Sequence, residues 1–93
     1  MTNIVLIHGT WCDGTVWGEF ADDLQKLGLN VYTPTLRYHD LPYEEVEKKV
    51  ADVSLDEFAD DIVDLIETLD EAPIVLGHSL GGLLAQKVAM KTM

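Results

Sequence analysis

A serine between two glycines, in residues 77–81 (GHSLG), is the part of the sequence best suited to chemistry. An apolar run at residues 74–76, typical of a buried strand, precedes it, and an apolar segment with helical character follows it. Glycines two positions before and after Ser79 allow a very tight turn in which larger side chains would collide. We therefore predict a strand, a sharp turn and a helix, with the Ser79 hydroxyl raised at the turn as a nucleophile. The alternative is a glycine-rich turn that only packs the helix onto the strand.

Three apolar runs are expected to form the strands that position this serine. They cover residues 4–7, 31–33 and 74–76, and helical patterns lie between them and after the last. This alternation is typical of an α/β fold with a three-stranded parallel sheet and flanking helices. Sites in such sheets form at the carboxyl ends of the strands. The segment that begins with His8 and Gly9 and the turn at Ser79 should therefore lie near each other.

The segments between the strands have different helical signals. Residues 17–27 place large apolar side chains on one face and are followed by Gly28, a typical helix stop. Ser54 and Glu57 have the spacing of a capping box, and an apolar stripe continues from there to Leu69. Residues 35–53 are expected to be irregular or weakly helical, and His39 is expected to be an exposed loop histidine.

Composition restricts the partners and the location of the chain. It has 93 residues, enough for one small domain over residues 1–93, and its net charge of −11 makes nucleic acid and anionic membranes poor partners. Cys12 is the only cysteine, which suits a reducing interior, and the amino terminus lacks the pattern of a signal peptide or membrane span. We expect a cytoplasmic protein. The three histidines have no metal-binding spacing, and no cofactor is expected.

These motifs together resemble the α/β-hydrolase superfamily, particularly its small esterase and hydroxynitrile-lyase-like branches. The resemblance rests on a strand that ends in His8-Gly9, on Trp17 and on residues 77–82 (GHSLGG), and it covers most of the chain. It implies that the chain is the amino-terminal part of an α/β-hydrolase fold.

The resemblance also implies roles for residues of the site. Ser79 would be the nucleophile, and the backbone N–H groups of Thr10 and Leu80 would form an oxyanion hole. His8, Gly9 and His78 would lie beside the pocket, and Trp11 and Cys12 would line its mouth. The substrate would be an ester or a similar small acyl compound.

The acid and the histidine that complete this machinery in the family are missing after Ser79. They follow the nucleophile along the chain, but residues 80–93 contain no Asp, Glu or His. We expect the chain to be truncated and to be inactive or weakly active alone. His39 is a remote candidate for a substitute base, and His8 a weaker one. A lyase of the same fold and a non-catalytic module are the alternative functions.

The missing part predicts how the chain associates. If the strand at residues 74–76 lies at the edge of the sheet, its backbone N–H and C=O groups are unpaired on one side. We expect a homodimer, a higher oligomer or a complex with a complementing chain to cover that edge.

Overall fold

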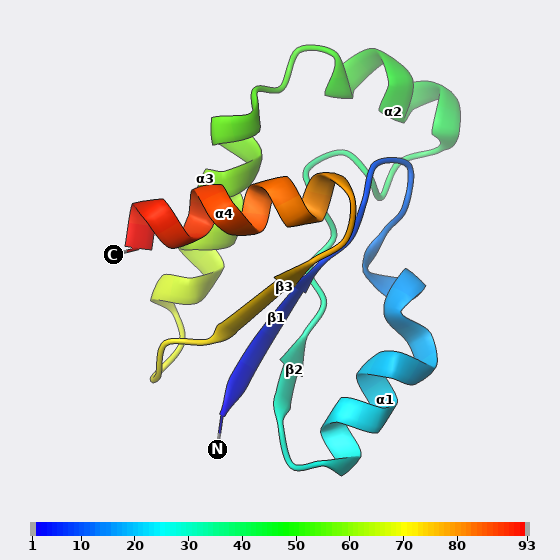
Figure 1. Ribbon diagram of the computed structural model, residues 1–93. Helices are drawn as coiled ribbons and strands as arrows, with labels where there is room; N and C mark the ends of the chain where they lie inside the picture. The colour runs from blue at the N-terminus through cyan, green and yellow to red at the C-terminus, as the bar shows by residue number, and fades with distance from the viewer. Residues whose placement is uncertain (1, 93) are drawn as a thin grey trace.

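The sheet has three parallel strands, as the sequence predicts, and their order is β2-β1-β3. The computed structural model describes residues 2–92, and Met1 and Met93, which the predicted domain includes, lie outside the described residues. The strands are β1 (Asn3–Ile7), β2 (Asn30–Tyr32) and β3 (Ile74–Gly77). β1 lies in the middle, so β3 is an edge strand (Figure 1).

Helices of different lengths connect and follow these strands. They are the 3-10 helix η1 (Gly14–Trp17), α1 (Gly18–Lys26), α2 (Tyr43–Val50), α3 (Leu55–Glu67) and α4 (Leu80–Thr92). α3 packs against α4, which lies over β1 and β3, whereas α1 contacts β2 (Figure 1). The connection from β1 to β2 and the one from β2 to β3 run in opposite directions across the sheet. If both are right-handed, α1 lies on one face and α3 on the other, and α4 packs beside α3.

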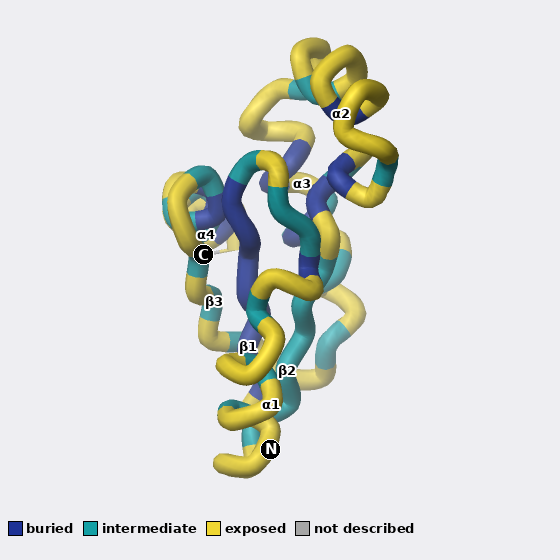
Figure 2. Tube along the Cα trace, turned by 90° about the vertical axis from the view of Figure 1, so that its right-hand side faces the viewer, coloured by how far each residue is buried: buried dark blue, intermediate teal, exposed yellow. Residues whose placement is uncertain are grey.

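The hydrophobic core lies between the sheet and the pair α3 and α4. Every residue of β1 is buried, since the strand is central and covered on both faces (Figure 2). The core side chains come from β1, from the segment after β2 and from both helices: Val5, Ile7, Leu36, Phe58, Ala59, Ile62, Leu84 and Val88.

The capping box at the start of α3 is confirmed. The Ser54 hydroxyl accepts a hydrogen bond from the backbone N–H of Glu57 at 3.1 Å, and the Glu57 carboxylate accepts one from the N–H of Ser54 at 3.1 Å. Two of the unpaired donors at the helix start are thereby satisfied. The predicted stripe of α3 faces the core through Phe58 and Ile62.

The first helix differs from the prediction at its start and on its apolar face. The Asp13 side chain accepts a hydrogen bond from the N–H of Thr15 at 2.8 Å, so a 3-10 turn begins at Gly14, before the predicted start. Gly28 has a φ of +94°, in agreement with its predicted role as the helix stop. Phe20 and Leu27 remain exposed, because α1 contacts the sheet mainly at β2.

Part of the segment expected to be irregular or weakly helical forms a regular helix. α2 begins after Pro42, with acidic residues in its first turn and Lys48 and Lys49 in its last. This charge distribution favours a helix, since it complements the helix dipole. Only Val46 of α2 is buried, so the helix lies on the surface.

Candidate active site

The turn after β3 is sharp, and its backbone is strained at Ser79. Ser79 has a φ of +58°, a left-handed conformation that residues other than glycine rarely adopt. A Cβ atom at Gly77 would fall on the backbone carbonyl of Gly81, and one at Gly81 would fall on that of Ile7. The two glycines therefore permit both the tight turn and the close approach of α4 to β1.

The segment after β1 packs directly against this turn. Gly9 is buried, and a Cβ built there would lie 3.2 Å from the Ser79 Cβ and 3.3 Å from the carbonyl oxygen of His78. The backbone N–H of His78 donates a hydrogen bond to the Ile7 carbonyl at 3.1 Å. Parallel pairing of β1 and β3 thus brings the two glycine motifs to one end of the sheet.

Among the described residues, two of the segments that meet at this turn have backbone donors without a partner. Ser79 and His78 are exposed, and Thr10 and Leu80 are half-buried. Within residues 2–92, the backbone N–H groups of Thr10 and Leu80 donate to no protein acceptor. The first N–H groups of a helix have no partner within it, which explains the free donor at Leu80.

His8 has a structural position and does not contact the serine through a hydrogen bond. Its side chain is fully buried, its Nε2 accepts a hydrogen bond from the N–H of Leu36 at 2.9 Å, and its Nδ1 lies 2.7 Å from the Gly9 carbonyl. Because Nε2 is an acceptor, Nδ1 carries the hydrogen and donates it to Gly9. Burial lowers the pKa of His8, so the imidazole is neutral. The ring joins the segments that follow β1 and β2.

The expectation that His39 is exposed is wrong. Only 6% of the residue is exposed, and its ring packs against those of His8 and Phe58, at centroid distances of 5.2 and 5.7 Å. Its Nδ1 donates to the Arg37 carbonyl at 3.1 Å. Packing of α3 and α2 over the loop covers the ring, which the local sequence does not reveal. No hydrogen bond in the described residues joins His39 to Ser79.

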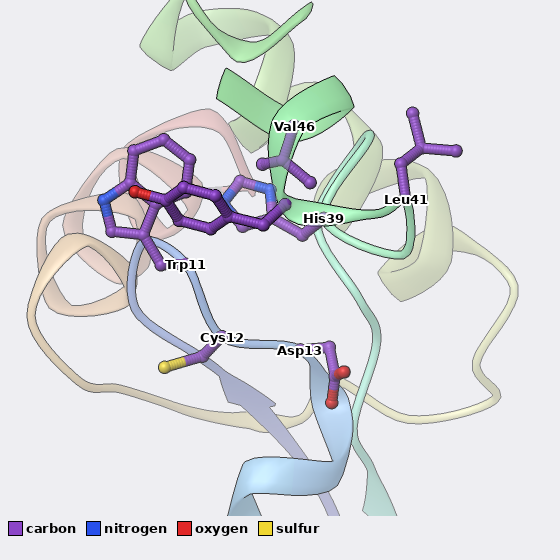
Figure 3. Close-up of a pocket in the computed structure, with 7 residues that line it drawn as sticks. Trp11, Cys12, Asp13, His39, Leu41 and Val46 are labelled. Atoms are coloured by element: carbon purple, nitrogen blue, oxygen red, sulfur yellow. The ribbon is translucent and has the colours of Figure 1, made fainter. Parts of the chain in front are cut away.

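A pocket of about 180 Å³ opens beside the segment after β1 (Figure 3). The predicted residues Trp11 and Cys12 line it, whereas His8, Gly9 and His78 do not. Its other walls come from the loop after β2 and from α2, and sequence reasoning missed them. The spacing of Tyr43 and Val46, three residues apart on one helix face, is the signal that could have revealed this wall.

The described part of the chain shows neither a metal-binding cluster nor a helix that could span a membrane. Residues 2–92 contain no group of three or more His, Cys, Asp or Glu side chains placed to hold a metal ion. None of the helices in this range has both the length and the apolar composition that crossing a membrane requires.

Comparison with known proteins identifies the family. The model of the alpha/beta hydrolase family matches residues 4–92, nearly the whole chain. The chain belongs to the α/β-hydrolase family. The family match and the structural neighbours described below assign it to the amino-terminal portion of the fold, as the sequence resemblance predicts.

Two relatives of this α/β-hydrolase chain are named as an esterase and a hydrolase. It is 35% identical over 91 residues to a carbendazim hydrolyzing esterase of Nocardioides sp., covering 96% of this chain and 36% of the relative. It is 30% identical over 82 residues to a pyrethroid hydrolase of Sphingobium wenxiniae, covering 88% of this chain and 28% of the relative.

Solved structures share the fold of this α/β-hydrolase chain. An extracellular α/β-hydrolase from a Paenibacillus species, described as similar in structure and function to tobacco salicylic acid binding protein 2, has a TM-score of 0.79 at 35% identity, covering 98% of this chain and 36% of its own. The pyrethroid hydrolase PytH has a TM-score of 0.81 at 27% identity, covering 98% and 35%. The chain thus spans about a third of the length of these relatives.

Proposed function

We propose that Ser79 is the nucleophile of a serine esterase that acts on small carboxylic esters or similar acyl compounds. The observation that carries this proposal is the left-handed, exposed Ser79 at the start of α4, packed against Gly9. The left-handed backbone of Ser79 costs free energy that a relaxed conformation would not. Strained residues of this kind cluster at functional sites. The names of the relatives, an esterase and a pyrethroid hydrolase, favour ester substrates.

The oxyanion hole is part of the same proposal. The free backbone N–H groups of Thr10 and Leu80 flank Ser79 along the two segments that meet there. When the serine oxygen attacks an acyl carbon, negative charge develops on the carbonyl oxygen. Fixed backbone donors stabilise that charge, and each is worth about 10²–10³ in rate.

Proton transfer from the serine hydroxyl requires a base, and among residues 2–92 no side chain is hydrogen-bonded to Ser79. Residues 80–93 contain no Asp, Glu or His, both His8 nitrogens are engaged, and the buried His39 donates to the Arg37 carbonyl. We infer that the acid and the histidine come from outside residues 1–93, on a longer chain or on a complementing one. Residues 1–93 alone are expected to be inactive or weakly active. A cytoplasmic location stays a prediction that rests on the single cysteine, Cys12.

A fluorophosphonate probe tests the nucleophile directly. Ser54 is the only other serine, so Ser54→Ala is the matched control for Ser79→Ala. We expect slow covalent labelling of the 93-residue chain, mapped to Ser79 by peptide mass spectrometry. Labelling should disappear in Ser79→Ala and persist in Ser54→Ala. Equal labelling of Ser79→Ala and the unmodified chain would contradict the proposal, and no labelling of any variant would favour the second candidate below.

Ester turnover tests the missing base. Hydrolysis of p-nitrophenyl acetate by residues 1–93 should be close to the background rate. A version extended with the carboxyl-terminal two thirds of a relative should hydrolyse the ester faster by orders of magnitude. Ser79→Ala should abolish this increase in rate. Turnover of the 93-residue chain at a rate typical of esterases would contradict the inferred need for an outside base.

Self-association through β3 is the second candidate function, and two exposed apolar side chains favour it. Ile74 and Leu76 are 52% and 39% exposed, although they pair in register with Ile4 and Leu6, which are buried. They lie beside these residues on one face of the sheet, and the outer edge of β3 has no neighbouring strand among the described residues. A second copy, added as a strand, would pair the edge and cover both side chains.

Light scattering after gel filtration tests this candidate. A dimer of the 93-residue chain that becomes monomeric in Leu76→Lys supports it. Leu27→Lys, at an exposed apolar position at the end of α1 and outside β3, is the control and should leave the dimer intact. A monomer at micromolar concentration refutes self-association.

A further inference from the structure

The pocket beside the Trp11 segment has the size and the walls of a site for one aromatic ring. Its volume is about 180 Å³, and Trp11, Tyr43, Leu41 and Val46 supply aromatic and aliphatic surface (Figure 3). A cavity of about 150 Å³ with apolar walls is known to accept benzene. The space is therefore sufficient for a single ring with a small substituent and too small for two fused or linked rings.

His39 contributes a polar group to this pocket, and Cys12 and Asp13 also line it. Its Nε2 is buried and has no hydrogen-bond partner among the described residues. Because Nδ1 donates its hydrogen to the Arg37 carbonyl, Nε2 is the acceptor in the tautomer that carries a single ring hydrogen. A buried acceptor without a partner is unfavourable, so a ligand that supplies an O–H or N–H donor gains by satisfying it.

Two exposed aromatic residues line the pocket together with His39. Trp11 and Tyr43 are 51% and 64% exposed, and their ring centroids lie 5.0 Å apart. Tyr43 is the first residue of α2, a surface helix anchored by the single buried side chain of Val46. Because Nε2 is buried, a ligand must displace a covering side chain to reach it.

We propose that this pocket binds a single aromatic ring that carries a hydroxyl or amino group, with its O–H or N–H donated to His39 Nε2. Phenol is the simplest member of the class. The ring would lie against Trp11 and Tyr43, where offset aromatic contacts add to the burial of its surface.

The charges near the pocket exclude acidic members of this class. Asp13 lies in the pocket wall, and hydrogen bonds from Thr15 lower the pKa of its carboxyl group, so it is ionised at neutral pH. The net charge of the chain is −11. A ring with a carboxylate is therefore repelled, and 4-hydroxybenzoate should bind more weakly than phenol.

A ligand series tests the hydrogen bond without any change to the protein. Titration of the ¹⁵N-labelled 93-residue chain with phenol should shift the Trp11 indole resonance, with a Kd on the order of 1 mM. Anisole and toluene have nearly the same shape but no donor, and they should bind roughly three- to tenfold more weakly. Equal affinity of phenol and toluene, or no saturable binding of phenol, overturns the proposal.

Two substitutions then locate the site. His39→Phe keeps a ring at this position and removes the acceptor, so phenol and toluene should bind it equally well. Phe20→Ala, on α1 and outside the pocket, is the control and should retain the preference for phenol. A preference for phenol that survives in a folded His39→Phe contradicts the assignment, and the ligand series alone decides the matter if that variant does not fold.

The site is independent of the proposed nucleophile. Ser79 does not line the pocket, so Ser79→Ala should bind phenol as the unmodified chain does. Loss of probe labelling with phenol binding intact, or the reverse, shows which of the two proposals has failed.

Discussion

Two neighbouring glycines at the start of α4 should respond in opposite ways to the same substitution. A Cβ at Gly81 would fall on the backbone carbonyl of Ile7 and lie 2.8 Å from that of His8, whereas a Cβ at Gly82 would meet only the Gly77 carbonyl oxygen at 3.5 Å, an ordinary contact. Both glycines lie in the helix, where alanine is intrinsically favoured by about 1 kcal/mol. Packing alone therefore distinguishes Gly81→Ala from Gly82→Ala.

The expected magnitudes follow from the atoms involved. At Gly81 the obstacle is backbone on a central strand, which cannot move away as a side chain can, so overpacking should reach about 3 kcal/mol, the upper part of its usual range. After the gain in helix propensity, Gly81→Ala should lower the free energy of unfolding by about 2 kcal/mol. Gly82→Ala should leave it unchanged or raise it by up to about 1 kcal/mol.

Urea unfolding followed by circular dichroism measures both variants. With an m-value of about 1 kcal/mol/M for a chain of this size, the two midpoints should differ by about 2–3 M. Fluorophosphonate labelling of Gly81→Ala should also fall, because the shift of α4 disturbs Ser79. Equal midpoints for the two variants would falsify the close approach of the turn to β1, and with it the geometry on which the proposed nucleophile depends.

Three further predictions concern the elements that hold the site. Burial lowers the pKa of His8 below its ordinary value of 6.5, so its contribution to stability is complete above pH 6.5 and declines as the pH falls below that value. The urea midpoint should therefore decrease between pH 7.5 and 5.5, and a flat profile would contradict the buried neutral ring. His8→Phe leaves the N–H of Leu36 without its acceptor and should cost about 1–3 kcal/mol or more, whereas His78→Phe, at an exposed position, should cost little. Ser54→Ala removes the capping box of α3 and should cost about 1 kcal/mol in the same assay, and an unchanged midpoint would show that the cap is not formed in solution.

The parts of the fold that depend on local pattern could be predicted from the sequence. The capping box at Ser54, the helix stop at Gly28 and the three strands each have a signal within a few residues, and the parallel sheet follows from their alternation. The turn at Ser79 belongs to this class, because its glycines are required by contacts within the turn and with the adjacent strand.

Features that depend on packing between distant segments could not be predicted in the same way. His39 is buried by Phe58 and by the loop around it, and nothing near it in the sequence indicates that cover. The sequence of α2 is mostly charged with one buried side chain, Val46, so its helical pattern is weak. The pocket between α2 and the Trp11 segment could not be predicted for the same reason. Its walls come from segments far apart in the sequence, and only the folded structure brings them together.

The position of β1 in the middle of the sheet has a consequence for how the protein is made. This strand is synthesised before β3 yet pairs with it, so that Ile4 meets Ile74 only after the segments between them have been translated. Until β3 is made, the apolar strand β1 has no partner along the edge that β3 will pair with. Such long-range parallel pairing is slow, and it favours aggregation of nascent chains. Efficient production of this protein should therefore depend on chaperones that bind extended apolar segments during translation.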